Sequence, residues 1–260
     1  MRKMPPANRL CALALLVLMP LASAVQAGEL ARIVAAADLR FAMDEMLEQF
    51  RATYPERPVE VIYGSSGRFR AQIEHGAPFD LFFSADIAYP QALQASGLVH
   101  GDVVPYALGR LVLWSDREDA SALHLSDLTD TRFRRIAIAN PRHAPYGARA
   151  QEALVASGLW DALEPRLVYG DNIMHTLQLV QSGAAEIGIV ALALAKSPVV
   201  VAQGDYYLID DSLHQPLHQG FVLTRRAAGN TTAQAFADFT GRPESREIMQ
   251  RYGFVLPEEE

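Results

Sequence analysis

The stretch that decides the fold is LARIVAAADLRFAMDEMLEQF, residues 30–50, in which an apolar run passes directly into a helical pattern. LARIVAAA has the continuous apolar character of a buried strand. After it, apolar residues recur every three or four positions and define one face of a helix. These residues are Leu39, Ala42, Met43, Met46, Leu47 and Phe50. The stretch therefore predicts a strand followed by a helix, with Asp38 at the junction.

The same alternation of strand and helix patterns continues along the chain. Further strands are expected at 59–64, 80–85, 111–114, 135–140, 166–170, 186–195, 206–210 and 220–226. Further helices are expected at 68–76, 88–97, 146–158, 172–183 and within 230–253. This order predicts an α/β fold whose sheets are mostly parallel and flanked by helices. The runs YALGRLVLWSDRE and HQGFVLTRRA could each pass between two lobes.

The N-terminal segment has the pattern of a secretory signal peptide. A basic start, MRKMPPANR, precedes the apolar run LCALALLVLMPLA and a small-residue site ending at Ala27. The apolar run is too short to span a bilayer comfortably, so we expect cleavage after Ala27 rather than a retained anchor. Residues 1–27 are therefore expected to be absent from an exported, periplasmic protein.

Charge and cysteine content exclude several classes of function. The formal charge is −7, and the loss of three basic residues with residues 1–27 would make it −10. A chain this acidic is a poor ligand for nucleic acid or an anionic membrane surface. Cys11 is the only cysteine and lies in the predicted signal peptide, so a mature chain could form no disulfide or thiolate metal site.

Four strand-to-helix junctions carry small or polar residues that could bind an anion. They are AAADL, YGSSGRF, NPRHAPYGAR and YGDNIMHT. In open α/β sheets, ligands bind beyond the carboxyl ends of the strands. Helix N-termini offer unpaired N–H groups and the positive end of the helix dipole. Several such termini at one point make an anion site without any charged side chain.

The serines of GSSG have two interpretations. Ser65 and Ser66 can donate hydrogen bonds to a ligand, and the flanking glycines permit close backbone approach. Either serine could instead serve as an ordinary N-cap. Both roles are possible if one serine caps the helix and the other faces the ligand.

The other two polar junctions are equally ambiguous. Tyr146 could donate its hydroxyl, or its segment could be a plain turn with Pro145 at the start of a helix. Asp171 or Asn172 could cap a helix whose first turn offers the backbone N–H of Ile173.

Signatures of catalysis are missing. GSSGR does not match the nucleophile elbow G-x-S-x-G, and no dinucleotide or P-loop motif occurs. A hydrolase using Ser65 or Ser66 with His143 is a remote alternative without a visible orienting acid. His214 and His218 are separated by Pro216, which would disrupt a ligating helix, so any metal site stays unknown. We expect no catalytic residues and no cofactor.

The chain resembles the periplasmic molybdate-binding proteins, which are the substrate-binding components of ABC importers. The resemblance rests on AAADLRFAM, YGSSGRFRAQIEHGAPFDLFFSAD, NPRHAPYGARAQEAL, EIGIV and QRYGFVLP, and spans nearly all of the mature sequence. It implies a periplasmic binding protein with two α/β lobes joined by two crossover strands. The implied lobes are 28–109 with 222–260, and 110–221.

The resemblance also implies a ligand and partners. The ligand would be a tetrahedral oxyanion, molybdate or tungstate, delivered by a monomer to an ABC permease and its ATPase. Ser66 matches a serine whose hydroxyl and N–H bind the anion. Tyr146 and Ile173 match positions that donate backbone N–H groups, and with Asp38 and Ser65 they complete the expected ligand-binding set.

Two positions depart from the family pattern. Ala191 stands where many members have a ligand tyrosine, a loss that Tyr146 could offset. Asp38 stands where the best-known members have a neutral donor. An ionised carboxylate about 4 Å from a dianion would cost roughly 8 kcal/mol at an effective dielectric near 20.

Three resolutions of the Asp38 conflict stay open. Asp38 could cap its own helix at the N–H groups of residues 40 and 41. The ligand could instead be an oxyanion carrying a proton that Asp38 accepts. Thirdly, it could be a metal ion or complex bound by Asp38 and Tyr146.

Overall fold

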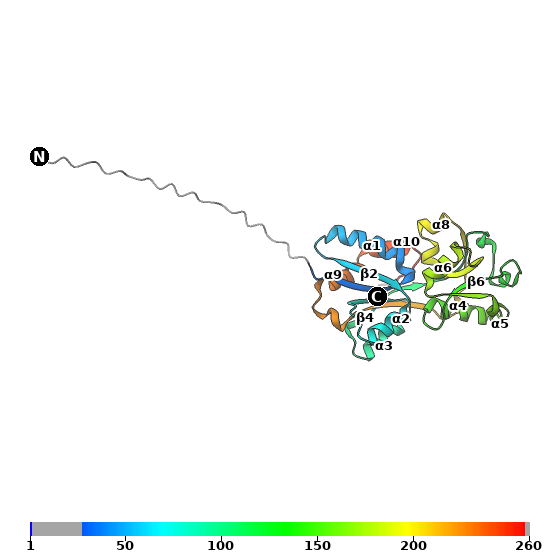
Figure 1. Cartoon of the computed structure of the whole chain (residues 1–260), viewed down its shortest axis with the longest axis horizontal. Coiled ribbons are helices and arrows are strands. Elements are labelled where there is room, and N and C mark those ends of the chain that lie inside the picture. The colour runs from blue at the N-terminus through cyan, green and yellow to red at the C-terminus, as the bar shows by residue number, and fades with distance from the viewer. Residues whose placement is uncertain (2–27, 258–260) are drawn as a thin grey trace.

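Two five-stranded sheets form the framework of the protein, and Figure 1 shows them as two lobes side by side. The computed structural model describes Met1 and residues 28–257, so the predicted signal peptide lies outside the described residues. The strand order is β2-β1-β3-β10-β4 in the first sheet and β7-β6-β8-β5-β9 in the second. Within the described part of the chain, no helix has the length and apolar character needed to cross a bilayer.

In each sheet four of the five strands run in the same direction, in agreement with the prediction, although two of the four pairings are antiparallel. The first sheet contains β1 (Ala31–Ala36), β2 (Val59–Gly64), β3 (Leu81–Ser84), β4 (Val99–Gly109) and β10 (Leu217–Thr224). The second contains β5 (Leu111–Ser115), β6 (Ile136–Ala139), β7 (Leu167–Gly170), β8 (Ile187–Ala191) and β9 (Asp205–Leu208). The pairing makes β10 the single reversed strand of the first sheet and β5 that of the second.

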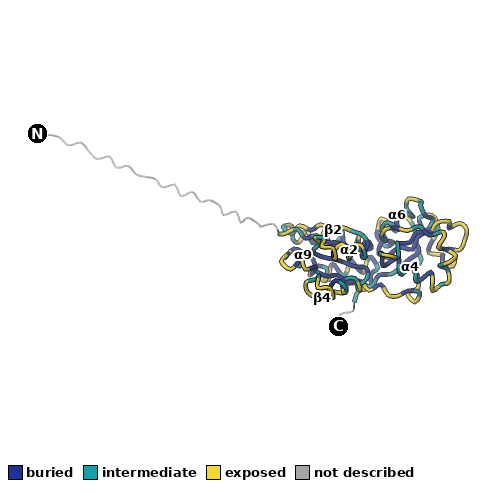
Figure 2. Tube along the Cα trace, turned by 60° about the horizontal axis from the view of Figure 1, so that its bottom comes forward, coloured by how far each residue is buried: buried dark blue, intermediate teal, exposed yellow. Residues whose placement is uncertain are grey.

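Helices cover both faces of the first sheet. The helices of this lobe are α1 (Arg40–Thr53), α2 (Ser66–Glu74), α3 (Ala88–Ala95), α9 (Thr231–Thr240) and α10 (Pro243–Arg251). Ile33 and Ala35 pack with α1, α9 and α10, whereas Val34 packs with α2 and α3. This alternation follows from the two-residue period of a strand. Figure 2 shows the resulting buried segments inside both lobes.

The predicted apolar face of α1 is confirmed. Leu39, Ala42, Met43, Met46, Leu47 and Phe50 are all buried. The ring of Phe50 meets Phe236 and Phe239 edge-on, at centroid distances of 5.1 and 5.4 Å. Burial of one such side chain contributes about 1.5–3 kcal/mol. The closing helices of the chain therefore complete the core of the first lobe.

The chain passes between the sheets twice. β4 ends at Gly109 in the first sheet, and β5 begins at Leu111 in the second. The return occurs between β9 and β10, and β10 pairs with β3 and β4 from Leu217 on. The lobe boundaries 28–109 with 222–260, and 110–221, stay a prediction.

The second lobe also corrects one expectation. Its helices are α4 (Pro145–Ala156), α5 (Trp160–Leu163), α6 (Ile173–Gln181), α7 (Leu192–Ala195) and α8 (Pro198–Val201). The predicted strand at 186–195 was wrong beyond Ala191, where the chain turns into α7. Leu192–Ala195 is as apolar and buried as the strand before it, so hydrophobic periodicity could not reveal the change.

The strand registers bring the four junctions to the ends of the sheets that face one another. Ala36 of β1 lies opposite Gly64 of β2, so both strands end at the same level. In the second sheet, Ala139 of β6 lies opposite Gly170 of β7. Parallel strands that end together place the following helix N-termini side by side.

Candidate anion-binding site

One cavity between the lobes collects residues from all four polar junctions. Its lining comprises Ala36, Ala37, Asp38, Gly64, Ser65, Ser66, Ala85, Ala144, Pro145, Tyr146, Asn172 and Ile173. The structure thus brings together all five residues predicted to bind the ligand. That they bind one stays a prediction. These lining residues include no arginine, lysine or histidine.

The free space in the cavity is small. The cavity offers about 10 Å³ to the centre of a water-sized sphere. A space of this size holds about one water molecule. A tetrahedral anion, which has four oxygens, is larger than this space, so we expect the lobes to separate when it binds.

Three helices begin at the cavity wall. α2 starts at Ser66, α4 at Pro145 and α6 at Ile173. Their dipoles add positive potential where they meet. The Asn172 side chain caps α6 by accepting the His175 N–H at 3.0 Å, which leaves the N–H of Ile173 outside that cap.

The two serines have different partners. The Ser66 hydroxyl accepts the Ala85 N–H at 3.0 Å, which leaves its own proton for a further acceptor. The Ser65 hydroxyl instead donates to the main-chain carbonyl of His143, in the other lobe. The Gly67 N–H donates to the same carbonyl at 3.0 Å. Ser65 therefore joins the lobes, whereas Ser66 keeps a donor for the cavity.

Asp38 is 1 % exposed and belongs to a buried polar cluster. Its Oδ2 accepts from the Tyr146 hydroxyl at 2.9 Å and from Gln219 Nε2 at 2.8 Å. Its Oδ1 is also buried and has no hydrogen-bond partner among the described residues. Burial raises the pKa of Asp38 to about 6, although the hydrogen bonds from Gln219 and Tyr146 and the nearby N–H groups of Asp38 and Leu39 lower it.

Sequence reasoning missed Gln219, which lies on β10, 181 residues from Asp38. Nothing local marks it, because a glutamine in a strand is an ordinary residue. Gly109 is the one sequence feature that weakly indicates the cluster of Asp38, Tyr146 and Gln219. A Cβ at this position would overlap the Tyr146 hydroxyl and approach Gln219 Nε2. The absence of a side chain at Gly109 therefore makes room for the cluster.

Two of the three resolutions for Asp38 find no support. The residues Ala37–Leu39 form a 3-10 turn, and neither this turn nor α1 has a side-chain cap. The cap at the N–H groups of residues 40 and 41 was therefore wrong, because Asp38 lies inside the turn and points to Tyr146 and Gln219. For a metal, the described residues contain no group of three or more His, Cys, Asp or Glu side chains that could hold one.

Further contacts join the lobes around the cavity. Arg68 of α2 pairs with Asp171 at 2.7 Å, and both side chains are more than half exposed. Arg149 of α4 lies 3.6 Å from Asp86 in a more buried position. Exposed ion pairs contribute little to stability. The hydrogen bonds from Ser65 and Gly67 to the His143 carbonyl therefore define the contact between the lobes better.

The contact between Ser65 and His143 does not have the geometry of a catalytic pair. The Ser65 hydroxyl lies 3.1 Å from His143 Nδ1, while His143 Nε2 faces the Arg68 guanidinium at 3.4 Å. In a catalytic triad, a carboxylate accepts a hydrogen bond from the second ring nitrogen of the histidine. In this protein the Arg68 guanidinium lies at that nitrogen. Burial and Arg68 lower the pKa of His143.

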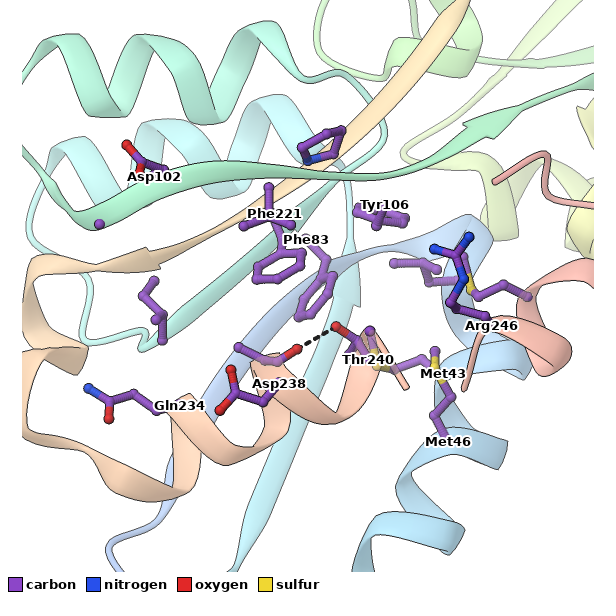
Figure 3. Close-up of a pocket in the computed structure, with 18 of the residues that line it drawn as sticks. Met43, Met46, Phe83, Asp102, Tyr106, Phe221, Gln234, Asp238, Thr240 and Arg246 are labelled. Atoms are coloured by element: carbon purple, nitrogen blue, oxygen red, sulfur yellow. Dashed lines mark hydrogen bonds between the residues drawn. The ribbon is translucent and has the colours of Figure 1, made fainter. Parts of the chain in front are cut away.

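A larger cavity of about 560 Å³ lies in the first lobe, between the sheet and helices α1, α9 and α10. Figure 3 shows the rings of Phe83 and Phe221 side by side on the sheet, with Met43 on the opposite wall. The two rings stack at 4.7 Å. Its walls are largely apolar and carry the carboxylates of Asp102 and Asp238 and the Arg246 guanidinium, and among the described residues no cluster of helix N-termini faces it as in the interlobe cavity. The interlobe cavity is therefore the better anion site.

Comparisons with known proteins agree with this geometry. The profile of a family described as bacterial extracellular solute-binding protein matches residues 31–255. The molybdate-binding protein ModA of Rhodobacter capsulatus is 35% identical over 98% of this chain and 99% of its own. The chain belongs to the periplasmic molybdate-binding protein family. ModA of Azotobacter vinelandii is 34% identical over 91% of this chain and 93% of its own.

A solved structure supports the same family membership. The periplasmic molybdate-binding protein of Azotobacter vinelandii superposes with a TM-score of 0.83 at 32% identity, covering 88% of this chain and 100% of that one. The family resemblance and its two-lobed fold are thereby confirmed. Members of this solute-binding family are transport components rather than enzymes, so the hydrolase alternative is set aside.

Proposed function

We propose that this chain is the periplasmic substrate-binding protein of an ABC importer and that it carries molybdate or tungstate. The observation that carries the proposal is the convergence of three helix N-termini on a cavity that is lined by serine and tyrosine hydroxyls and the Asp38 carboxyl and by no cation. Such a site holds a dianion by oriented dipoles alone. Relatives named as molybdate-binding proteins supply the ligand class.

Four of the lining residues have proposed roles. Ser66 donates its hydroxyl and its N–H from the start of α2. Ile173 donates its N–H from the start of α6. Tyr146 lies where the family donates a backbone N–H, and its hydroxyl orients Asp38 at 2.9 Å. Ser65 contributes by holding the lobes together through His143.

The location and partners follow from the same proposal. The segment 1–27 would export the chain to the periplasm, where a monomer would bind the anion. Closure of the lobes would present the loaded form to a membrane permease powered by an ATPase. A receptor for a protonated oxyanion or a metal is not favoured, because the relatives are named for molybdate.

A ligand screen tests the proposal. The mature chain, residues 28–260, is titrated with molybdate, tungstate, sulfate, phosphate and arsenate by calorimetry and thermal unfolding. A ligand at 100 times its Kd stabilises the fold by about 2.7 kcal/mol. We expect this response from molybdate and tungstate, and a much smaller one from the other anions. No response to any tetrahedral anion would contradict the proposal.

A further inference from the structure

Within the described part of the chain, only one of the two carboxyl oxygens of Asp38 has hydrogen-bond partners, and the other oxygen suggests a function for this residue. Oδ2 accepts two hydrogen bonds, from Tyr146 and Gln219, whereas the buried Oδ1 accepts none among the described residues. Asp38 also lines the cavity, and the neighbouring Ala36 and Ala37 carry no polar side-chain atom. A buried carboxylate oxygen without a partner is costly, so its presence calls for a functional explanation.

The charge on Asp38 opposes the proposed ligand. A buried carboxylate and a dianion repel each other strongly at short range. A neutral carboxylic acid would instead present an O–H donor. Since both neighbours donate to Oδ2, a proton is best accommodated on Oδ1, where it can point to a ligand oxygen.

We propose that Asp38 takes up one proton from solvent when the anion binds, and that the resulting Oδ1–H donates a hydrogen bond to an oxygen of the bound dianion. No covalent bond changes other than the new O–H bond, and the complex gains one positive charge relative to its separated parts. The proposal rests on the proposed function, because it concerns the same cavity. It differs from selection of a protonated anion, since the proton resides on the protein.

The surroundings favour this proton uptake. The titratable groups that face Asp38 are Tyr146 on α4 and Tyr106 on β4, and burial, followed by the charge of Asp38, raises the pKa of both tyrosines. Both therefore stay neutral in the physiological range. The other elements that pack against its turn are α1, α6, α7 and β2, and no charged side chain of theirs hydrogen-bonds Asp38 among the described residues. The raised pKa of about 6 fits a group that is easily protonated.

Gln219 acts in this scheme as a positioning residue. Its amide donates to Oδ2 at 2.8 Å and lies 3.1 Å from the Tyr146 hydroxyl. By occupying Oδ2, the amide directs the added proton to Oδ1. Because the same bond favours the ionised form, its loss is expected to raise the pKa of Asp38.

Calorimetry of molybdate binding measures the proton directly. Titrations at pH 5–8.5, in buffers of different ionisation enthalpy, give the number of protons taken up. For the wild type we expect about one proton per molybdate at pH 8, falling toward none near pH 5. Affinity should weaken about tenfold per pH unit above pH 7. Asp38→Asn, which keeps a donor but cannot titrate, should bind with no Asp38-linked proton and a flat pH profile.

Two further variants make the outcome decisive. His143→Gln removes the imidazole beside Ser65 but keeps the main-chain carbonyl to which Ser65 and Gly67 donate, so it separates proton uptake at Asp38 from uptake at this histidine. This variant should retain the proton uptake. Gln219→Met should move the pH profile upward, whereas a purely structural defect would weaken binding equally at every pH. The inference fails if wild-type protein binds molybdate without proton uptake, or if His143→Gln alone abolishes that uptake. Absence of molybdate binding at every pH would instead contradict the proposed function.

Discussion

At the scale of single residues, the buried carboxyl group of Asp38 faces the proposed ligand and lowers the stability of the fold when it is ionised. Its carboxyl is buried and half satisfied, and burial raises its pKa from the ordinary value of 3.8 to about 6. A raised carboxyl pKa means that the folded state binds the proton more tightly than the unfolded state. Stability from this group is therefore complete below pH 4 and is lost as the pH rises to 6.

The raised pKa of Asp38 predicts how the stability of Asp38→Asn depends on pH. Above pH 6, the variant should be more stable than the wild type by up to about 3 kcal/mol, since it carries no buried charge. The gain should shrink between pH 6 and 4 and disappear below pH 4. Urea unfolding of the ligand-free proteins across this range provides the measurement. A constant difference at all pH values would show that Asp38 does not titrate in this window.

The serines provide a second prediction at this scale. Ser66→Ala removes a hydroxyl with a proton left for the ligand, so we expect molybdate affinity to fall roughly ten- to a hundredfold. Ser65→Ala removes a bond to the His143 carbonyl and should cost less, through weaker closure. Isothermal titration of both variants compares them directly. Equal losses would contradict the different roles assigned to the two hydroxyls.

At the scale of elements, the N-terminus of α2 forms the main contact between the lobes. A Cβ on Gly67 would lie 2.6 Å from the carbonyl oxygen of His143, closer than real contacts allow. We expect Gly67→Ala to reduce affinity at least tenfold, because the lobes could not close fully, and to leave unfolding of the ligand-free protein nearly unchanged. Titration and thermal unfolding measure the two effects.

Gly229→Ala is the matched control for this substitution. Gly229 lies in a 3-10 turn after β10, and a Cβ there meets nothing within 4 Å. Both the affinity and the melting temperature of this variant should match the wild type. If Gly67→Ala bound molybdate as tightly as Gly229→Ala did, the closed geometry would not be required for binding.

The helices and the junction residues of the cavity show which features could be predicted from the sequence. The apolar face of α1 and the helix ends before Gly76 and Gly97, which have positive φ, followed from periodicity and local rules. The junction residues of the cavity followed from polar residues after apolar runs. Gln219 could not be predicted, because its role depends on a partner 181 residues away. Asp38 was wrongly interpreted as a possible cap, because the added 3-10 turn leaves no local pattern.

At the scale of the whole molecule, the small cavity implies motion between the lobes. The space of about 10 Å³ is smaller than a tetrahedral anion, so we expect ligand exchange to involve opening of the lobes. We expect molybdate to shift the population toward the compact form, with a smaller radius of gyration in X-ray scattering. Hydrogen exchange at the Gly67 N–H, which bonds across the cleft, should slow on binding. Unchanged scattering and exchange would indicate that the protein is already closed without ligand.

The strand order of the first sheet also has a consequence for biosynthesis. β10 lies between β3 and β4, although it is the last strand of the chain to be made. The five strands of the second sheet, by contrast, are contiguous in sequence between Leu111 and Leu208. Because the chain is made from its N-terminus, the second sheet can therefore assemble first. The first sheet cannot be completed until β10 is made, because β10 pairs with both β3 and β4. Chains truncated before Leu217 would therefore leave the edges of β3 and β4 unpaired and prone to aggregation.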